Sequence, residues 1–148
     1  MSASVDRLEQ LDPRALLSFG GLVALVATAG SLYLSEGMGL VPCELCWYQR
    51  ILMYPLVVVF GVAVLEGRVG VYRTVLPLSL AGFVIAGYHS WLQVAAGGRC
   101  TFGGGCAAVQ LRVAGLSIPN LSLLAFGLIA GTAALLWVRS PRKNAADG

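Results

Sequence analysis

The chain has 148 residues, of which 57% are hydrophobic and 11% are charged, and its formal net charge is +3 at pH 7. A soluble domain carries about a quarter charged residues, so this composition excludes an ordinary soluble globular protein. The net charge is also too small to indicate nucleic acid as a partner. Most lysine and arginine residues lie at the edges of long apolar runs, which is typical of an integral membrane protein.

Four apolar runs predict four membrane-spanning helices. A helix of about 20 residues rises about 30 Å, the thickness of the hydrocarbon core, and the runs have about that length. The first run is longer than the apolar core of a cleavable signal peptide, so we expect it to be retained as a helix. The sequence therefore predicts an all-α bundle that forms one domain over residues 1–148, with spans at about residues 15–35, 47–65, 75–94 and 118–138.

Small residues recur at helical spacing in the first and last spans. The first span carries Gly20, Ala24 and Ala27, and the last carries Gly127 and Gly131 as a Gly-x-x-x-Gly pair. Small residues allow the backbones of neighbouring membrane helices to approach closely. Both sets predict helix packing inside the bundle.

Two cysteines, Cys43 and Cys46, stand directly before the second span. Their spacing lets the sulfurs form and reopen a disulfide, although it also occurs in zinc sites. If the span is a helix, Cys46 lies in or just before its first turn, where the helix dipole favours a thiolate. Arg50 follows Cys46 by four residues and so shares its helix face. The alternative is a structural disulfide beside an interfacial arginine.

The longest loop, residues 95–117, holds the second cysteine pair, Cys100 and Cys106. Five residues separate the two cysteines, and the glycines among them make this segment conformationally permissive. A disulfide can therefore close within the loop. The apolar residues that follow, from Val109 on, form a segment too short to be assigned as helix or strand.

The distribution of basic residues predicts the orientation of the bundle. Cytoplasmic loops of membrane proteins carry an excess of lysine and arginine. One side of the predicted membrane holds seven such residues: Arg7, Arg14, Arg68, Arg73, Arg139, Arg142 and Lys143. The other side holds three: Arg50, Arg99 and Arg112. We therefore expect both termini in the cytoplasm and both cysteine pairs on the outer face, where disulfides persist.

Two cysteine pairs on one oxidising face can pass a disulfide between them by thiol exchange, two electrons at a time. The sequence offers no haem-attachment motif, dinucleotide loop or metal triad to accept those electrons, so a lipid-soluble acceptor fits best. One rival is a four-cysteine metal site in a membrane transport or binding protein. Against it, outward-facing thiols should oxidise, and Arg50 would repel a cation. A second rival is an inert bundle with two structural disulfides.

The stretch Cys-Glu-Leu-Cys-Trp-Tyr-Gln-Arg at residues 43–50 resembles the disulfide bond formation protein B (DsbB) family, the membrane quinone-coupled thiol oxidases, and most of all its short BdbC-like branch. Residues 51–55, Ile-Leu-Met-Tyr-Pro, and residues 118–126, Ile-Pro-Asn-Leu-Ser-Leu-Leu-Ala-Phe, continue the likeness. The resemblance implies a protein of the bacterial cell membrane whose cofactor is a quinone, either ubiquinone or menaquinone.

The same resemblance assigns roles to residues. It implies that Cys43 and Cys46 are the pair next to the quinone, with Cys46 nearest the ring and Arg50 holding the quinone. It implies that Cys100 and Cys106 oxidise an extracytoplasmic thioredoxin-like thiol oxidase of the DsbA or BdbD kind. This chain departs from the long branch of the family, in which many more residues separate the second pair. His89, at the expected membrane level of Cys46 and Arg50, is either an interfacial histidine or a donor to a quinone oxygen.

Overall fold

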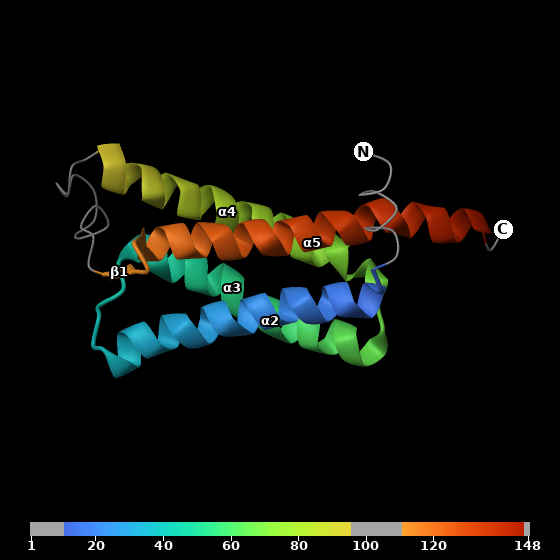
Figure 1. Ribbon diagram of the computed structural model, residues 1–148, viewed down its shortest axis with the longest axis horizontal. Coiled ribbons are helices and arrows are strands. Elements are labelled where there is room, and N and C mark those ends of the chain that lie inside the picture. The colour runs from blue at the N-terminus through green and yellow to red at the C-terminus, as the bar shows by residue number, and fades with distance from the viewer. Residues whose placement is uncertain (1–10, 96–110, 147–148) are drawn as a thin grey trace.

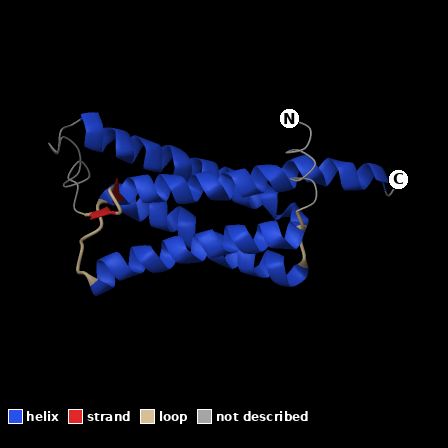
Figure 2. Cartoon of the chain, in the orientation of Figure 1, coloured by secondary structure: helices blue, strands red, loops and turns tan. Residues whose placement is uncertain are grey.

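The computed structural model describes residues 11–95 and 111–146, with side chains as far as Ser140. Four long helices dominate it, joined by short turns and one small hairpin (Figures 1 and 2). In chain order the elements are α2 (Pro13–Leu32), η1 (Tyr33–Gly37), α3 (Glu44–Glu66), η2 (Val69–Val71), α4 (Tyr72–Ala95), β1 (Arg112–Val113), β2 (Leu116–Ser117) and α5 (Ile118–Ala146).

The four long helices confirm the predicted membrane bundle. Each is long and apolar enough to cross a bilayer, with mean hydropathy between 1.6 and 2.1 in its most apolar stretch. The helices run side by side, α2 against α3, α3 against α4 and α4 against α5, and α5 closes the bundle against α2 (Figure 1). Much of the outward surface is leucine, valine, phenylalanine and tryptophan, as a lipid-facing surface requires.

The helix ends differ from the sequence expectation by a few residues, and local chemistry explains why. Asp12 caps α2 by accepting a hydrogen bond from the backbone N–H of Arg14, and Pro13 occupies the first helical position, where its missing N–H costs nothing. The first span continues past Ser35 through the π-helical turn η1. The second helix begins at Glu44, three residues earlier than expected, and it ends where Gly67 adopts a left-handed conformation.

A two-residue hairpin precedes α5, in the segment that the sequence left unassigned. Strands β1 and β2 pair antiparallel, with Val113 opposite Leu116. Ala114 and Gly115 form the turn, both with positive φ, at 51° and 83°, as a type I′ turn requires. Alanine rarely adopts this conformation, so residue type alone is a poor guide to this turn.

Two buried phenylalanine rings in the core pack against glycines. A Cβ atom on Gly20 would lie 2.6 Å from Cζ of Phe60, and a Cβ on Gly82 would overlap the ring of Phe126. Both rings are fully buried. Gly20 thus packs closely, as expected.

The Gly-x-x-x-Gly prediction for the last span is wrong in part. Gly127 lies against the ring of Phe83, which is 3.3 Å from the position that a Cβ atom would take. Gly131, however, is exposed and has no atom within 4 Å of the corresponding position. A second and closer contact between α4 and α5 is made by Gly82 and Phe126. Gly82 of α4, which the sequence analysis did not single out, therefore takes the part expected of Gly131.

Replacing Gly82 with alanine should destabilise the bundle, because the new methyl group meets a buried ring that has little room to move. We expect the free energy of unfolding in detergent to fall by about 1–3 kcal/mol, the usual cost of overpacking. Gly131→Ala is the matched control and should be neutral or slightly stabilising, since alanine favours helix. Circular dichroism during denaturation measures both, and equal effects would show that the Gly82 contact is unimportant.

Candidate active site

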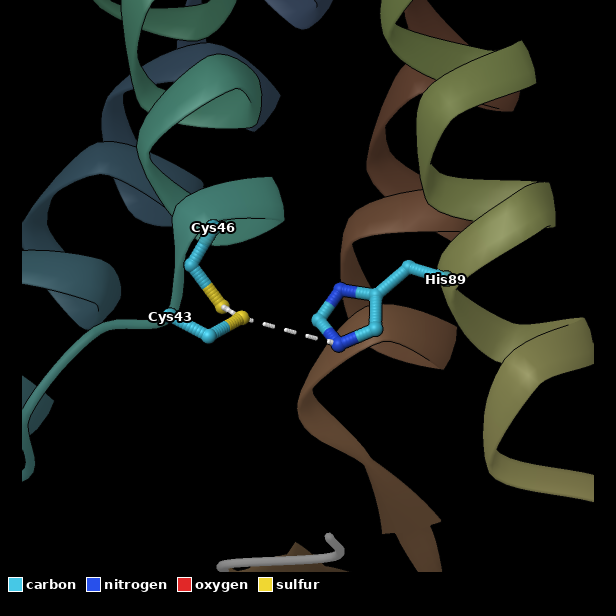
Figure 3. Close-up of side chains that lie close together, drawn as sticks. All are labelled: Cys43, Cys46 and His89. Carbon is cyan, nitrogen blue, oxygen red and sulfur yellow. Dashed lines mark hydrogen bonds between the residues drawn. The ribbon is translucent and has the colours of Figure 1, made fainter. Parts of the chain in front are cut away.

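The first cysteine pair lies at the N-terminus of α3. Cys43 is the N-cap residue, with an extended backbone, and its carbonyl accepts the first helical hydrogen bond from Trp47 at 3.1 Å. Cys46 therefore lies in the first turn, as the sequence predicted. The two sulfurs are 3.0 Å apart (Figure 3). A disulfide bond is about 2.05 Å long, so a movement of about 1 Å separates this arrangement from a bond.

Cys46 and Arg50 line the same pocket, which confirms that they share a face of α3. The pocket holds about 590 Å³ of space, including its open mouth. Helices α2, α3 and α5 and the segment before Cys43 form its walls. The lining residues are mainly apolar, with polar groups from serine, glutamine, arginine and tyrosine: Ala27, Ser31, Leu34, Ser35, Leu40, Pro42, Cys46, Gln49, Arg50, Met53, Tyr54, Ile118, Ser122 and Phe126.

Arg50 is fixed in the pocket wall by a neighbouring helix. Its Nε donates a hydrogen bond to Oγ of Ser31 at 2.9 Å, and its Nη2 donates to the carbonyl oxygen of Ser31 at 3.0 Å. The guanidinium also lies over the ring of Trp47, 5.5 Å from its centroid. Arg50 therefore presents a permanent positive charge in a set position, and it couples α3 to α2.

Tyr54 places an unsatisfied hydroxyl group in the same region. Its Oη atom is buried and has no hydrogen-bond partner among the described residues. Tyr54 follows Arg50 by four residues, so Cys46, Arg50 and Tyr54 form one row along α3. A buried hydroxyl without a partner is costly unless a bound molecule accepts its hydrogen bond.

His89 meets the cysteine pair from α4, and it is only 2% exposed. Its Nε2 lies 3.8 Å from Sγ of Cys43, and its Nδ1 lies 3.1 Å from Nε2 of Gln49 (Figure 3 shows the cysteine contact). The expectation that His89 shares the level of the cysteines is therefore met. However, His89 is not among the residues that line the pocket, and it contacts Cys43 and Gln49 instead.

Sequence reasoning overlooked three residues of this site: Ser31, Gln49 and Tyr54. Gln49 carried a usable signal, because a glutamine inside an apolar span is costly unless it has a partner. Tyr54 carried only its place in residues 51–55, which resemble the family, and Ser31 carried no signal that separates it from ordinary helix residues. The second cysteine pair, Cys100 and Cys106, lies outside the described residues.

Cys43, Cys46 and His89 bring three potential metal-binding atoms within 4.8 Å of one another. Zinc binds sulfur at about 2.3 Å in a tetrahedron, which places two sulfur ligands about 3.8 Å apart. The observed separation of the two sulfurs is 3.0 Å. This geometry is better suited to a disulfide than to zinc.

Comparisons with a family model and with known proteins indicate the same family. Residues 13–136 match the model of the family described as disulfide bond formation protein DsbB. The chain is 44% identical over 113 residues to disulfide bond formation protein C of Bacillus subtilis (strain 168), covering 73% of this chain and 82% of that protein. It is 40% identical over 141 residues to a probable disulfide formation protein of Deinococcus radiodurans, covering 86% and 90%.

A probable disulfide formation protein of Oceanobacillus iheyensis is 41% identical over 112 residues, which covers 72% of this chain and 77% of that protein. No solved structure matches the chain. The residues that match the family include the first cysteine pair, the pocket and most of the four long helices.

Proposed function

We propose that this chain passes electrons from an extracytoplasmic thioredoxin-like thiol oxidase to a quinone. The chain belongs to the disulfide bond formation protein DsbB family, and it is therefore a membrane oxidoreductase that takes part in disulfide formation. The observation that carries this proposal is the arrangement of Cys46, Arg50 and Tyr54 along one wall of a largely apolar pocket. The proposed reaction keeps the partner oxidised, so that it can introduce disulfides into exported proteins.

The pocket suits a flat, lipid-soluble ring with carbonyl oxygens. Apolar side chains form most of its lining, and a small number of polar groups can fix the orientation of a ligand. The buried hydroxyl of Tyr54 lacks a partner in the described structure and would donate to such an oxygen. When bound, a quinone supplies an acceptor for two electrons and two protons. These features support the choice of cofactor, whether ubiquinone or menaquinone.

Different residues of this chain would then have different roles in the reaction. Cys46 presents its sulfur to the pocket from the first turn of α3, where the helix dipole favours a thiolate. Arg50, held by Ser31, keeps a positive charge where negative charge would develop. Cys43 would exchange with the second cysteine pair. Since His89 lies against Cys43 and Gln49 and does not line the pocket, we do not assign it to the quinone.

We place the cysteine end of the bundle on the outer face of the membrane. Arg14, Arg68, Arg73 and Arg139 lie at the opposite end among the described residues, where α2 begins and α5 ends (Figure 1). Positive charge favours the cytoplasmic side, so this clustering supports cytoplasmic termini. The proposed location is the bacterial cell membrane.

The orientation predicts that the cysteines of intact, mildly reduced cells react with a membrane-impermeant thiol reagent. The reagent cannot cross the bilayer, so it reaches only cysteines on the outer face. Mass spectrometry of the purified protein would measure labelling at each cysteine. Labelling that requires the membrane to be opened would place the cysteines in the cytoplasm.

The proposed function predicts that the protein purified in detergent reduces quinone when it is supplied with a reduced thioredoxin-like partner. The absorbance of the quinone measures this reaction. Arg50→Gln should raise the quinone concentration needed for half-maximal rate by about tenfold or more, because losing a charge-assisted hydrogen bond costs about 1.5–3 kcal/mol. Thiol exchange with the partner should change much less.

Arg68→Gln is the matched control for that variant, because it also removes one guanidinium, from a surface ion pair with Glu66 at the other end of the bundle. It should leave quinone use unchanged. Equal quinone affinity in Arg50→Gln and the parent protein would remove Arg50 from the site. If no quinone is reduced and the preparation contains stoichiometric zinc, the rival metal-binding function is favoured instead.

The last proposed element is the order of exchange. A bulky partner should reach the loop pair first, so its thiolate would attack Cys100 and release Cys106 as a thiolate. Cys106 would then attack Cys43 and release Cys46, the better leaving group because its thiolate is stabilised. The partner's second thiolate would then break the bond to Cys100 and leave the partner oxidised. Cys100 would attack Cys106, which re-forms the loop disulfide and releases Cys43, so the first pair is left reduced. Re-forming the Cys43–Cys46 disulfide gives up two electrons and two protons.

This order predicts that Cys106→Ser accumulates a mixed disulfide between Cys100 and the partner. Since this variant has no loop disulfide, the Cys100 thiolate would attack the disulfide of the oxidised partner and release one partner thiolate. The Cys106 thiolate that would displace the partner from Cys100 is absent. Cys46→Ser should stop turnover with quinone. Non-reducing gels and peptide mapping identify the cross-linked residue. Cross-linking mainly to Cys43 when Cys100 and Cys106 are both present would contradict the order and leave the loop pair as a structural clip.

A further inference from the structure

The buried contact between Gln49 and His89 determines which ring nitrogen faces Cys43. Gln49 is 5% exposed and His89 is 2% exposed. Such buried polar groups need hydrogen-bond partners. The amide nitrogen of Gln49 lies 3.1 Å from Nδ1 of His89, and Nε2 of the same ring lies 3.8 Å from the sulfur of Cys43. Gln49 of α3, His89 of α4 and the N-cap residue Cys43 therefore form one connected row.

The chemistry of the side-chain amide gives this row a direction. An amide nitrogen carries two N–H groups and no lone pair for hydrogen bonding, so Gln49 donates. Nδ1 of His89 must then accept, and it carries no proton. A neutral imidazole has one protonated nitrogen, which is therefore Nε2, the atom that faces Cys43.

We propose that Gln49 is a positioning residue that holds His89 with its proton on Nε2, so that His89 donates a hydrogen bond to the sulfur of Cys43. In this arrangement the histidine is a donor and not a base toward Cys43, because its one lone pair is occupied by Gln49. A thiolate is a stronger acceptor than a thiol, so the contact favours the reactive form of Cys43.

This arrangement gives the two cysteines separate means of stabilisation. Cys46 lies inside the first turn of α3 and faces the pocket with Arg50. Cys43 is the N-cap residue, outside the turn, and faces α4. The helix dipole acts on Cys46, and His89 acts on Cys43. Both sulfurs are thereby prepared for closing their disulfide, and on the proposed function a bound quinone would accept the two electrons that the pair gives up.

The inference concerns the same site as the proposed function and rests on it for the fate of the electrons, but its tests need neither quinone nor partner, so either can fail alone. His89 is the only histidine in the chain. Nitrogen-15 labelling of histidine in the full-length protein, purified without a histidine tag, therefore reports this ring alone. We expect Nδ1 to give the resonance of an unprotonated nitrogen and Nε2 that of a protonated one.

In Gln49→Glu we expect Nδ1 to give the resonance of a protonated nitrogen. A carboxylate can only accept a hydrogen bond, so it draws a proton onto that nitrogen. Ser90→Ala is the matched control. Ser90 adjoins His89 on α4, and its hydroxyl is buried without a partner among the described residues, so its loss should not move the ring resonances. A protonated Nδ1 in the parent protein, or an unchanged Nδ1 in Gln49→Glu, would overturn the proposal.

The donor function needs a second measurement, on the sulfur. In a background of Cys46→Ser, Cys100→Ser and Cys106→Ser, Cys43 is the one remaining cysteine, and its alkylation rate by iodoacetamide follows its thiolate fraction. His89→Phe and Gln49→Met should each slow alkylation by roughly fivefold, whereas Ser90→Ala should not. An unchanged rate in His89→Phe would show that the histidine does not act on Cys43, even if its tautomer is as proposed.

Discussion

The start of α3 is the constraint on which the rest of the site depends. Because Cys43 caps the helix and Cys46 lies in its first turn, the two sulfurs meet at 3.0 Å while facing different surroundings. One sulfur borders the pocket, and the other lies against His89. A helix that began a few residues later would leave both sulfurs in a loop without this division.

Polar groups within an apolar bundle are costly unless they are paired, and the pairs seen here tie the helices together. Arg50 binds Ser31 across α3 and α2, and Gln49 binds His89 across α3 and α4. The same contacts therefore hold the bundle in register and orient the site. Tyr54 is the exception, because its hydroxyl has no partner in the described structure; we assign that hydroxyl to a ligand.

Close packing supports this polar cluster from the core of the bundle. Phe60 fits against Gly20, and Phe126 fits against Gly82. Phe126 also lines the pocket, so the contact between α4 and α5 reaches the site directly. Without a hydrophobic driving force between helices in lipid, such van der Waals contacts decide which helix faces meet.

The sequence by itself determined the features that depend on neighbouring residues. Run length predicted the four spans, and the four-residue step placed Cys46 and Arg50 on one face of α3. Tertiary structure decided everything that depends on how one helix is rotated against another. The contact of His89 with Gln49 joins residues 40 positions apart, and Gly82, rather than Gly131, meets a ring of the neighbouring helix. Helical periodicity fixes which residues share a face, but only packing across the bundle fixes what that face touches.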